Sequence, residues 1–110
     1  MELKPVNWTY EQQAQFETAR DIISTLQGIL IRQSSITNNQ NKKKAFQKRI
    51  QELQHELDSF DYYDEKIIKN IIETYSQLIR KYDNMGNSDE EISIKGLPEE
   101  FLTTKIDYSK

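Results

Sequence analysis

The chain has 110 residues, of which 35% are hydrophobic and 30% are charged, and its formal net charge at pH 7 is −3. A single domain of this length buries only about two-thirds of its extended-chain surface, so the core must be thin. The absence of cysteine excludes disulfides and thiolate metal sites. With three glycines and two prolines there is little material for sheet-type turns, which favours an all-α fold.

The sequence shows no sign of a membrane or secreted protein. No segment approaches the roughly 18 consecutive apolar residues of a membrane span, and the first residues lack the basic and apolar regions of a signal peptide. We therefore expect a cytoplasmic protein. The abundance of Ile, Lys, Asn and Tyr is typical of A+T-rich genomes, which suggests a bacterium or its phages and plasmids.

A first helix is predicted from Thr9, which is followed three residues later by Gln12 in the arrangement of a capping box. Its end is predicted in the run of Ser, Thr and Asn at residues 34–41, whose side chains compete for backbone hydrogen bonds. Helical spacing places one apolar row on this segment: Ala19, Ile22, Leu26, Ile29 and Ile36, widened by Phe16, Ile23 and Leu30.

A second helix is predicted over residues 41–59, with its apolar row at Phe46, Ile50, Leu53, Leu57 and Phe60. Continuing this row would place Asp64 in the core. Either the helix breaks near residues 59–61 and restarts with Asp61 as its cap, or one helix over residues 41–84 continues through a stutter. We expect the break, because a helix that long would need a second chain to cover it.

The third helix, which is predicted to end near residues 84–86, has the widest apolar stripe. Such a stripe is stabilised mainly by packing, so the other helices are expected to cover it. The prediction is a small antiparallel three-helix bundle over residues 1–86, followed by an irregular tail over residues 87–110. The stripe consists of Ile68, Ile71, Tyr75, Leu78 and Tyr82, with Ile67, Ile72 and Ile79 beside it.

Within the tail, residues 92–94 alternate like a short strand, and Pro98 is placed as at the start of a short helix. Four apolar residues would share one face of that helix. The face could pack on the protein's own bundle or could bind a partner. These candidate partner-binding residues are Leu97, Phe101, Leu102 and Ile106.

Charges on the second helix oppose its dipole, which favours anions at the N-terminus and cations at the C-terminus. Either they pair with other helices, or the helix continues past both ends, or they form two patches of opposite sign that steer a partner. The basic patch consists of Lys42, Lys43, Lys44, Lys48 and Arg49. The acidic corner consists of Asp58, Asp61, Tyr62, Tyr63, Asp64 and Glu65.

No catalytic residues, cofactor or metal ligands are expected. Glu52 and His55 match the Glu-x-x-His pair of di-iron bundles, but a core row at Leu53 and Leu57 turns both toward solvent. Nucleic-acid binding through the basic patch is disfavoured, because aromatic residues for base stacking are missing and the net charge is negative.

Residues 60–73, FDYYDEKIIKNIIE, resemble the start of the last helix in enterocin and pediocin-type bacteriocin immunity proteins. That family consists of small cytoplasmic bundles of four helices, whereas three are predicted here. The resemblance implies a protein that protects its host by engaging a bacteriocin's membrane receptor complex, with the tail helping to set specificity.

The function expected from the sequence is therefore a non-enzymatic, protein-binding inhibitor or an immunity or antitoxin-like protein. The partner would be a protein such as a toxin, a receptor or an effector complex, and the chain would be a monomer or homodimer. Two alternatives remain. One is a phage- or plasmid-encoded inhibitor of host defence or a nucleic-acid-linked regulator that uses the basic patch. The other is a self-associating structural subunit.

Overall fold

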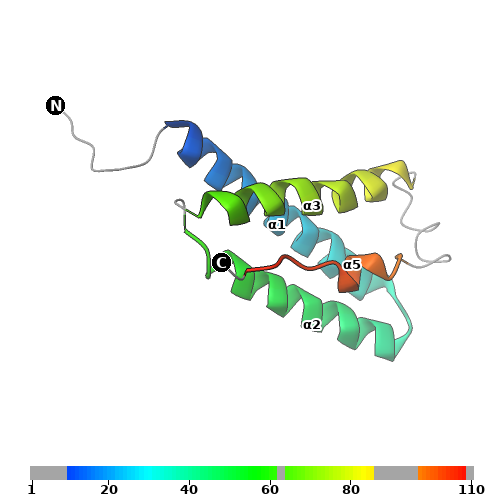
Figure 1. The fold of residues 1–110 in the computed structure, drawn as a ribbon. Coiled ribbons are helices and arrows are strands. Elements are labelled where there is room, and N and C mark those ends of the chain that lie inside the picture. Colours follow the sequence, from blue (N-terminus) through cyan, green and yellow to red (C-terminus); the bar gives the residue numbers. More distant parts are fainter. Residues whose placement is uncertain (1–9, 62–63, 86–96, 109–110) are drawn as a thin grey trace.

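The computed structural model describes residues 10–61, 64–85 and 97–108. Its elements are α1 (Tyr10–Ile36), α2 (Gln40–Leu57), α3 (Glu65–Asn84) and the short helix α5 (Glu100–Thr103), and the described ranges contain no strand. Successive long helices run in alternating directions (Figure 1). The predicted all-α class and the antiparallel three-helix bundle are confirmed.

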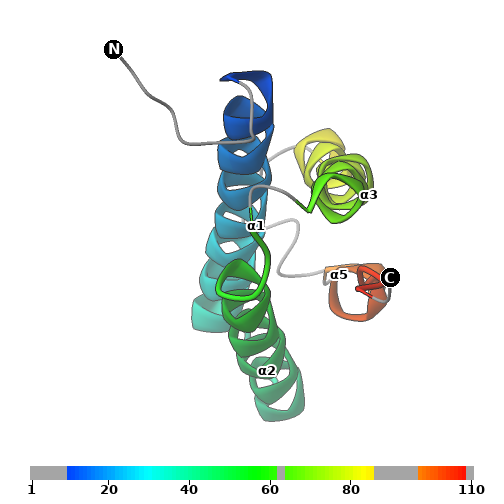
Figure 2. The ribbon, with the colours of Figure 1, turned by 60° about the vertical axis from the view of Figure 1, so that its left-hand side comes forward.

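Helix α1 is the centre of the bundle, because it packs against both α2 and α3. Helix α2 lies along α1, whereas α3 crosses it: in Figure 2, α3 is seen nearly end-on while α1 is seen from the side. A helix with two different partners needs a wide buried stripe, which α1 provides with two neighbouring apolar rows. Its buried residues are Ala19, Ile23, Leu26, Ile29, Leu30, Gln33 and Ser34.

The turn between α1 and α2 is closed by a side-chain cap. Asn39 Oδ1 accepts hydrogen bonds from the backbone N–H groups of Asn41 at 3.0 Å and Lys42 at 3.1 Å. These two N–H groups have no intrahelical acceptor, so the amide side chain satisfies donors that the helix leaves open. The cap fixes the start of α2 at Gln40.

Substitution of Asn39 by alanine is expected to lower the free energy of unfolding by about 0.5–2 kcal/mol, because both cap bonds are lost. The matched control is Asn38→Ala, which changes an exposed neighbour of the same type. Urea unfolding followed by circular dichroism would measure both variants. Equal losses in the two would show that the cap contributes nothing specific.

The predicted break after the second helix is confirmed: α2 ends at Leu57 and α3 begins at Glu65. The predicted cap was wrong, because the residue that precedes α3 is Asp64, whose Oδ2 accepts the backbone N–H of Asp61 at 3.0 Å. Phe60 anchors the connection in the core, with its ring edge against Phe16 at a centroid distance of 5.4 Å. The apolar phase slip is therefore a corner and not a stutter.

The C-terminal segment, residues 97–108, lies between α2 and α3 (Figure 1). Phe101 is 2% exposed and Ile106 is 9% exposed, and both belong to the main hydrophobic core. Leu97 and Leu102 are partly buried against the same core. Of the two roles predicted for this face, the structure places it on the protein's own bundle, so these side chains do not form a free surface. The strand predicted at residues 92–94 lies outside the described residues.

Candidate functional site

A buried cluster of polar side chains joins α2, α3 and the C-terminal segment. The polar cluster consists of Arg49 and Glu56 from α2, Tyr75 from α3 and Tyr108. Arg49 donates to Glu56 Oε2 at 3.3 Å, to the Tyr75 hydroxyl at 2.9 Å and to the backbone carbonyl of Thr104 at 2.8 Å. Glu56 Oε1 accepts from the hydroxyls of Tyr75 at 2.7 Å and Tyr108 at 2.8 Å.

Helical spacing explains why these charges meet inside the protein. Arg49, Leu53 and Glu56 follow 4-3 spacing, so they form one row on α2 that shares Leu53 with the apolar row. That row faces the C-terminal segment, which supplies Thr104 O and the Tyr108 hydroxyl. Both charged residues are buried, Arg49 at 3% exposed and Glu56 at 9%.

Burial and the neighbouring carboxylate perturb the titration of the cluster. Desolvation, followed by the hydrogen bond to Glu56 and its negative charge, raises the pKa of both Tyr75 and Tyr108 above the ordinary value. Desolvation lowers the pKa of Arg49, but the interactions with Tyr75 and Glu56 outweigh it and raise the pKa overall. The cluster therefore holds a charged guanidinium and two neutral phenols.

The polar cluster has the features of a structural element, because most of its hydrogen bonds are made between its own side chains. Glu56 accepts from the guanidinium and from two phenols, and Arg49 also donates to Glu52 at 3.1 Å. Buried charges persist when they are paired in this way. One donor is left over, since Arg49 Nε is buried without a partner in the described part of the chain.

The structure corrects the predicted basic patch at one position. Arg49 lies inside the protein and cannot contribute to a surface. Lys42, Lys44 and Lys48 are exposed, and Lys43 is half-buried. None of these four lysines forms an ion pair with any residue that the structure describes. The first half of α2 therefore presents four lysines whose charges are not neutralised locally.

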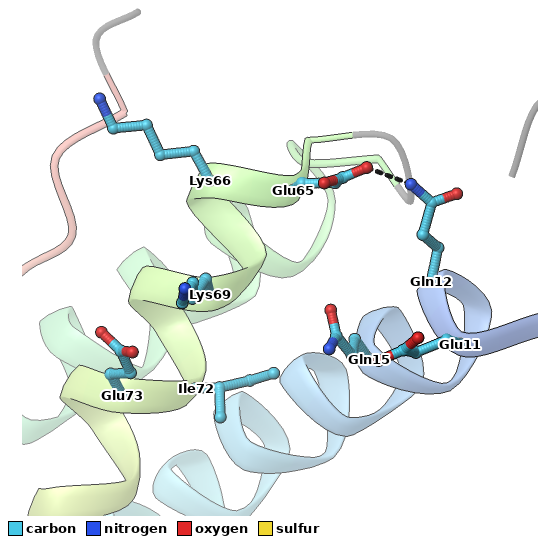
Figure 3. A pocket seen from close by; sticks show the side chains of 8 residues that line it. All are labelled: Glu11, Gln12, Gln15, Glu65, Lys66, Lys69, Ile72 and Glu73. Carbon is cyan, nitrogen blue, oxygen red and sulfur yellow. Dashed lines mark hydrogen bonds between the residues drawn. The ribbon is translucent and has the colours of Figure 1, made fainter. Parts of the chain in front are cut away.

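The acidic corner is partly a surface and partly a turn. Asp58, Asp61 and Glu65 are exposed, whereas Asp64 is half-buried and holds the Asp61 N–H. Glu65 accepts a hydrogen bond from the side chain of Gln12 on α1 (Figure 3). Tyr62 and Tyr63 lie outside the described residues.

The two charged patches lie at opposite ends of α2, and both ends are true helix termini. The interpretation that this helix continues past them is wrong. The interpretation that the charges pair with other helices does not hold for the lysines within the described ranges. The interpretation that the charges form two patches that steer a partner stays a prediction.

A groove between α1 and α3 begins at the acidic corner (Figure 3). Ile72 points across it toward α1, and the bond between Gln12 and Glu65 spans one end. Charged side chains of both signs form its rims. The lining residues are Glu11, Gln12, Gln15, Glu65, Lys66, Lys69, Ile72 and Glu73. Tyr10, which is 90% exposed, precedes them on α1.

The described residues show neither a metal-binding group nor a membrane-spanning helix. Within them, no three side chains of His, Asp or Glu are grouped so that they could hold a metal ion, and His55 is exposed. No helix in these ranges has the length and apolar character needed to cross a bilayer.

Comparison of the chain with known protein families, with curated proteins and with solved structures found no match.

Proposed function

We propose that the protein is a non-enzymatic binding protein, an inhibitor or an immunity or antitoxin-like protein, that recognises another protein by surface complementarity. The observation that carries this proposal is the charge pattern of α2. Lysines crowd its N-terminal half and carboxylates crowd the corner after its C-terminus. The four lysines have no ion-pair partner among the described residues.

Part of this pattern is unfavourable for α2, because Lys42 lies in its first turn and Asp58 is its C-cap. Asp64 and Glu65, in contrast, lie at the N-terminus of α3, where carboxylates are favourable. A charge that opposes the helix dipole in the first or last turn costs about 0.3–1 kcal/mol at low ionic strength. Two separated patches of opposite sign orient an approaching partner and accelerate its association. A surface selected for binding accounts for those charges at the ends of α2 that its dipole does not favour.

The acidic corner and the groove beside it are the best candidates for the main contact. Exposed Asp61 and Glu65 lie next to a groove with Ile72 at its side and exposed Tyr10 nearby. Aromatic residues are enriched at binding hot spots, and charges on the rim set orientation. The partner that fits is a protein with a basic surface and a small apolar projection. The resemblance of residues 60–73 to immunity proteins covers this same corner.

Reversing two charges tests the corner. The variant Asp61→Lys with Glu65→Lys is expected to weaken partner binding by about tenfold or more, because attractive contacts become repulsive. Asp64 is kept, since its carboxylate holds the turn. Affinity capture from cells that carry the gene, followed by titration of the purified partner, would measure the loss.

The matched control is Asp21→Lys with Asp83→Lys, which changes the net charge equally at two exposed acids away from the corner. Circular dichroism would verify that both variants remain folded. Wild-type affinity in the corner variant, or the same loss in the control, would contradict the assignment.

The lysines of α2 favour a second candidate function, the nucleic-acid-linked regulator. Its basic patch would consist of four lysines, because Arg49 is buried. Such a protein would bind generic DNA with an affinity that falls steeply with salt, because phosphate contacts release counterions. A salt titration of DNA binding decides between the two proposals. Sedimentation at several protein concentrations tests the third, a self-associating subunit.

A further inference from the structure

The C-terminal segment adds to the contacts between α2 and α3, which also meet directly where Tyr75 of α3 bonds to Arg49 and Glu56 of α2. It contacts α2 through Thr104, whose carbonyl accepts from Arg49, and through Tyr108, which donates to Glu56. It contacts α3 through an ion pair of 2.6 Å between Glu100 and Lys81. The segment therefore acts as a strap across the gap between α2 and α3.

The order of this strap depends on docking. Its only helix, α5, has four residues, which is far below the length at which an isolated helix is stable in water. Its anchors are the buried side chains of Phe101 and Ile106, with Leu97, Leu102 and Tyr108 partly buried against the same core. The remaining ties are the hydrogen bonds and the Glu100–Lys81 ion pair described above, and a second ion pair of 3.7 Å between Lys105 and Glu52. Segments with few anchors and little structure of their own open before the rest of a protein does.

The polar side chains covered by the strap, Arg49 and Glu56, become hydrated when the strap undocks. Arg49 and Glu56 are buried beside it, and Arg49 Nε has no partner among the described residues. A buried ion pair recovers much of its solvation when water enters, and this recovery offsets part of the lost contacts. The polar cluster thus stabilises the docked strap, and its hydration after undocking keeps the free energy of undocking moderate.

We propose that residues 97–108 dock and undock as one unit on a bundle of α1, α2 and α3 that stays folded, with Arg49 and Glu56 as the latch. In the docked state the surface between α2 and α3 is covered. In the undocked state this surface presents the Arg49–Glu56 pair and the apolar sites of Phe101 and Ile106. The inference is independent of the acidic corner, because it concerns a different face and does not require the proposed partner.

Thiol labelling tests the strap directly, because the chain has no cysteine of its own. Single variants Ile106→Cys in the strap and Ala19→Cys in α1 replace buried residues, which are 9% and 0% exposed. Under native conditions the thiol at position 106 is expected to react on the order of 100-fold faster than the thiol at position 19, because only the former is released by local opening. Thr103→Cys, at an exposed strap position, gives the rate of an unprotected thiol.

The role of the latch is tested by adding Tyr108→Phe, which removes one hydrogen bond to Glu56 and keeps the ring. This change should increase labelling at position 106 by about tenfold, as the loss of a bond to a buried charge predicts, and leave labelling at position 19 unchanged. Equal rates at positions 106 and 19 would overturn the strap. If labelling at position 106 is fast but Tyr108→Phe leaves its rate unchanged, the proposed role of Arg49 and Glu56 as the latch is wrong.

Hydrogen exchange of the unmodified protein provides a check without core substitutions. The amides of α5 donate to carbonyls within the segment, for example Leu102 N to Glu99 O at 2.8 Å and Thr104 N to Glu100 O at 3.0 Å. They are expected to exchange faster than the buried amides of α1 by the factor seen in labelling. Equal protection of the two sets would contradict local opening.

Discussion

Replacing Arg49 by methionine is expected to lower the free energy of unfolding by about 3–5 kcal/mol, because Glu56 would be left as a buried charge without its cation. The methionine fills a similar volume, so the loss reports on charge and hydrogen bonding more than on packing. Glu56 would keep only the hydroxyls of Tyr75 and Tyr108. Urea unfolding followed by circular dichroism at neutral pH would give the value.

Two companion variants separate the ion pair from general disruption. Glu56→Gln should cost less than Arg49→Met, because Arg49 keeps its ion pair with Glu52 at 3.1 Å. The double variant Arg49→Met with Glu56→Gln should be more stable than Arg49→Met alone, since it removes the buried charge. The interpretation fails if Arg49→Met costs under about 1 kcal/mol, or if the two single losses simply add.

The helices were predictable because their apolar rows are long and regular. The row from Phe46 to Phe60 defines the inner face of α2, and its phase slip before Ile68 correctly indicates a corner. The position of the C-terminal segment was left open between two roles. Whether Phe101 packs on the protein's own bundle or on a partner depends on the space between α2 and α3. That space results from three-dimensional packing, which the spacing of residues in the sequence does not determine.

The polar cluster was not predicted, although the sequence contains a signal for it. Arg49 was assigned to the basic patch because it adjoins a run of lysines, and Glu56 was given no role. Arg49 and Glu56 are seven positions apart, so both lie on the same face of the helix as the core residue Leu53. The partners from Tyr75 and Tyr108 could not be read from spacing, because they come from other segments.

The structure changes what the charges of α2 mean. Its two ends are real termini, so the lysines after Asn39 stand against the dipole within a finite helix. Inside the helix, the one pair that is buried has its charges satisfied by each other and by tyrosines. The same helix therefore separates charges that are paired inside the fold, on the row facing the C-terminal segment, from charges that are exposed near its ends.

Stability is expected to fall steeply above pH 10, at about 2.7 kcal/mol per pH unit, because Tyr75 and Tyr108 both have a raised pKa in the folded protein. In the unfolded chain these tyrosines lose their protons near the ordinary pKa of about 10. The folded protein still holds both protons there, so rising pH favours the unfolded state. Each tyrosine contributes about 1.4 kcal/mol per pH unit until its folded form also ionises.

Single phenylalanine variants assign this slope to the polar cluster. Either Tyr75→Phe or Tyr108→Phe should reduce the slope between pH 10 and 12 by about half, since one titrating group is removed. Tyr10→Phe, at a side chain that is 90% exposed, is the matched control and should leave the slope unchanged. Guanidinium unfolding at fixed pH values would measure all three. If the Tyr108→Phe slope equals that of the wild type while Tyr75→Phe abolishes the slope, then the strap releases Tyr108 before the bundle unfolds, and the alkaline titration becomes a second measure of that opening.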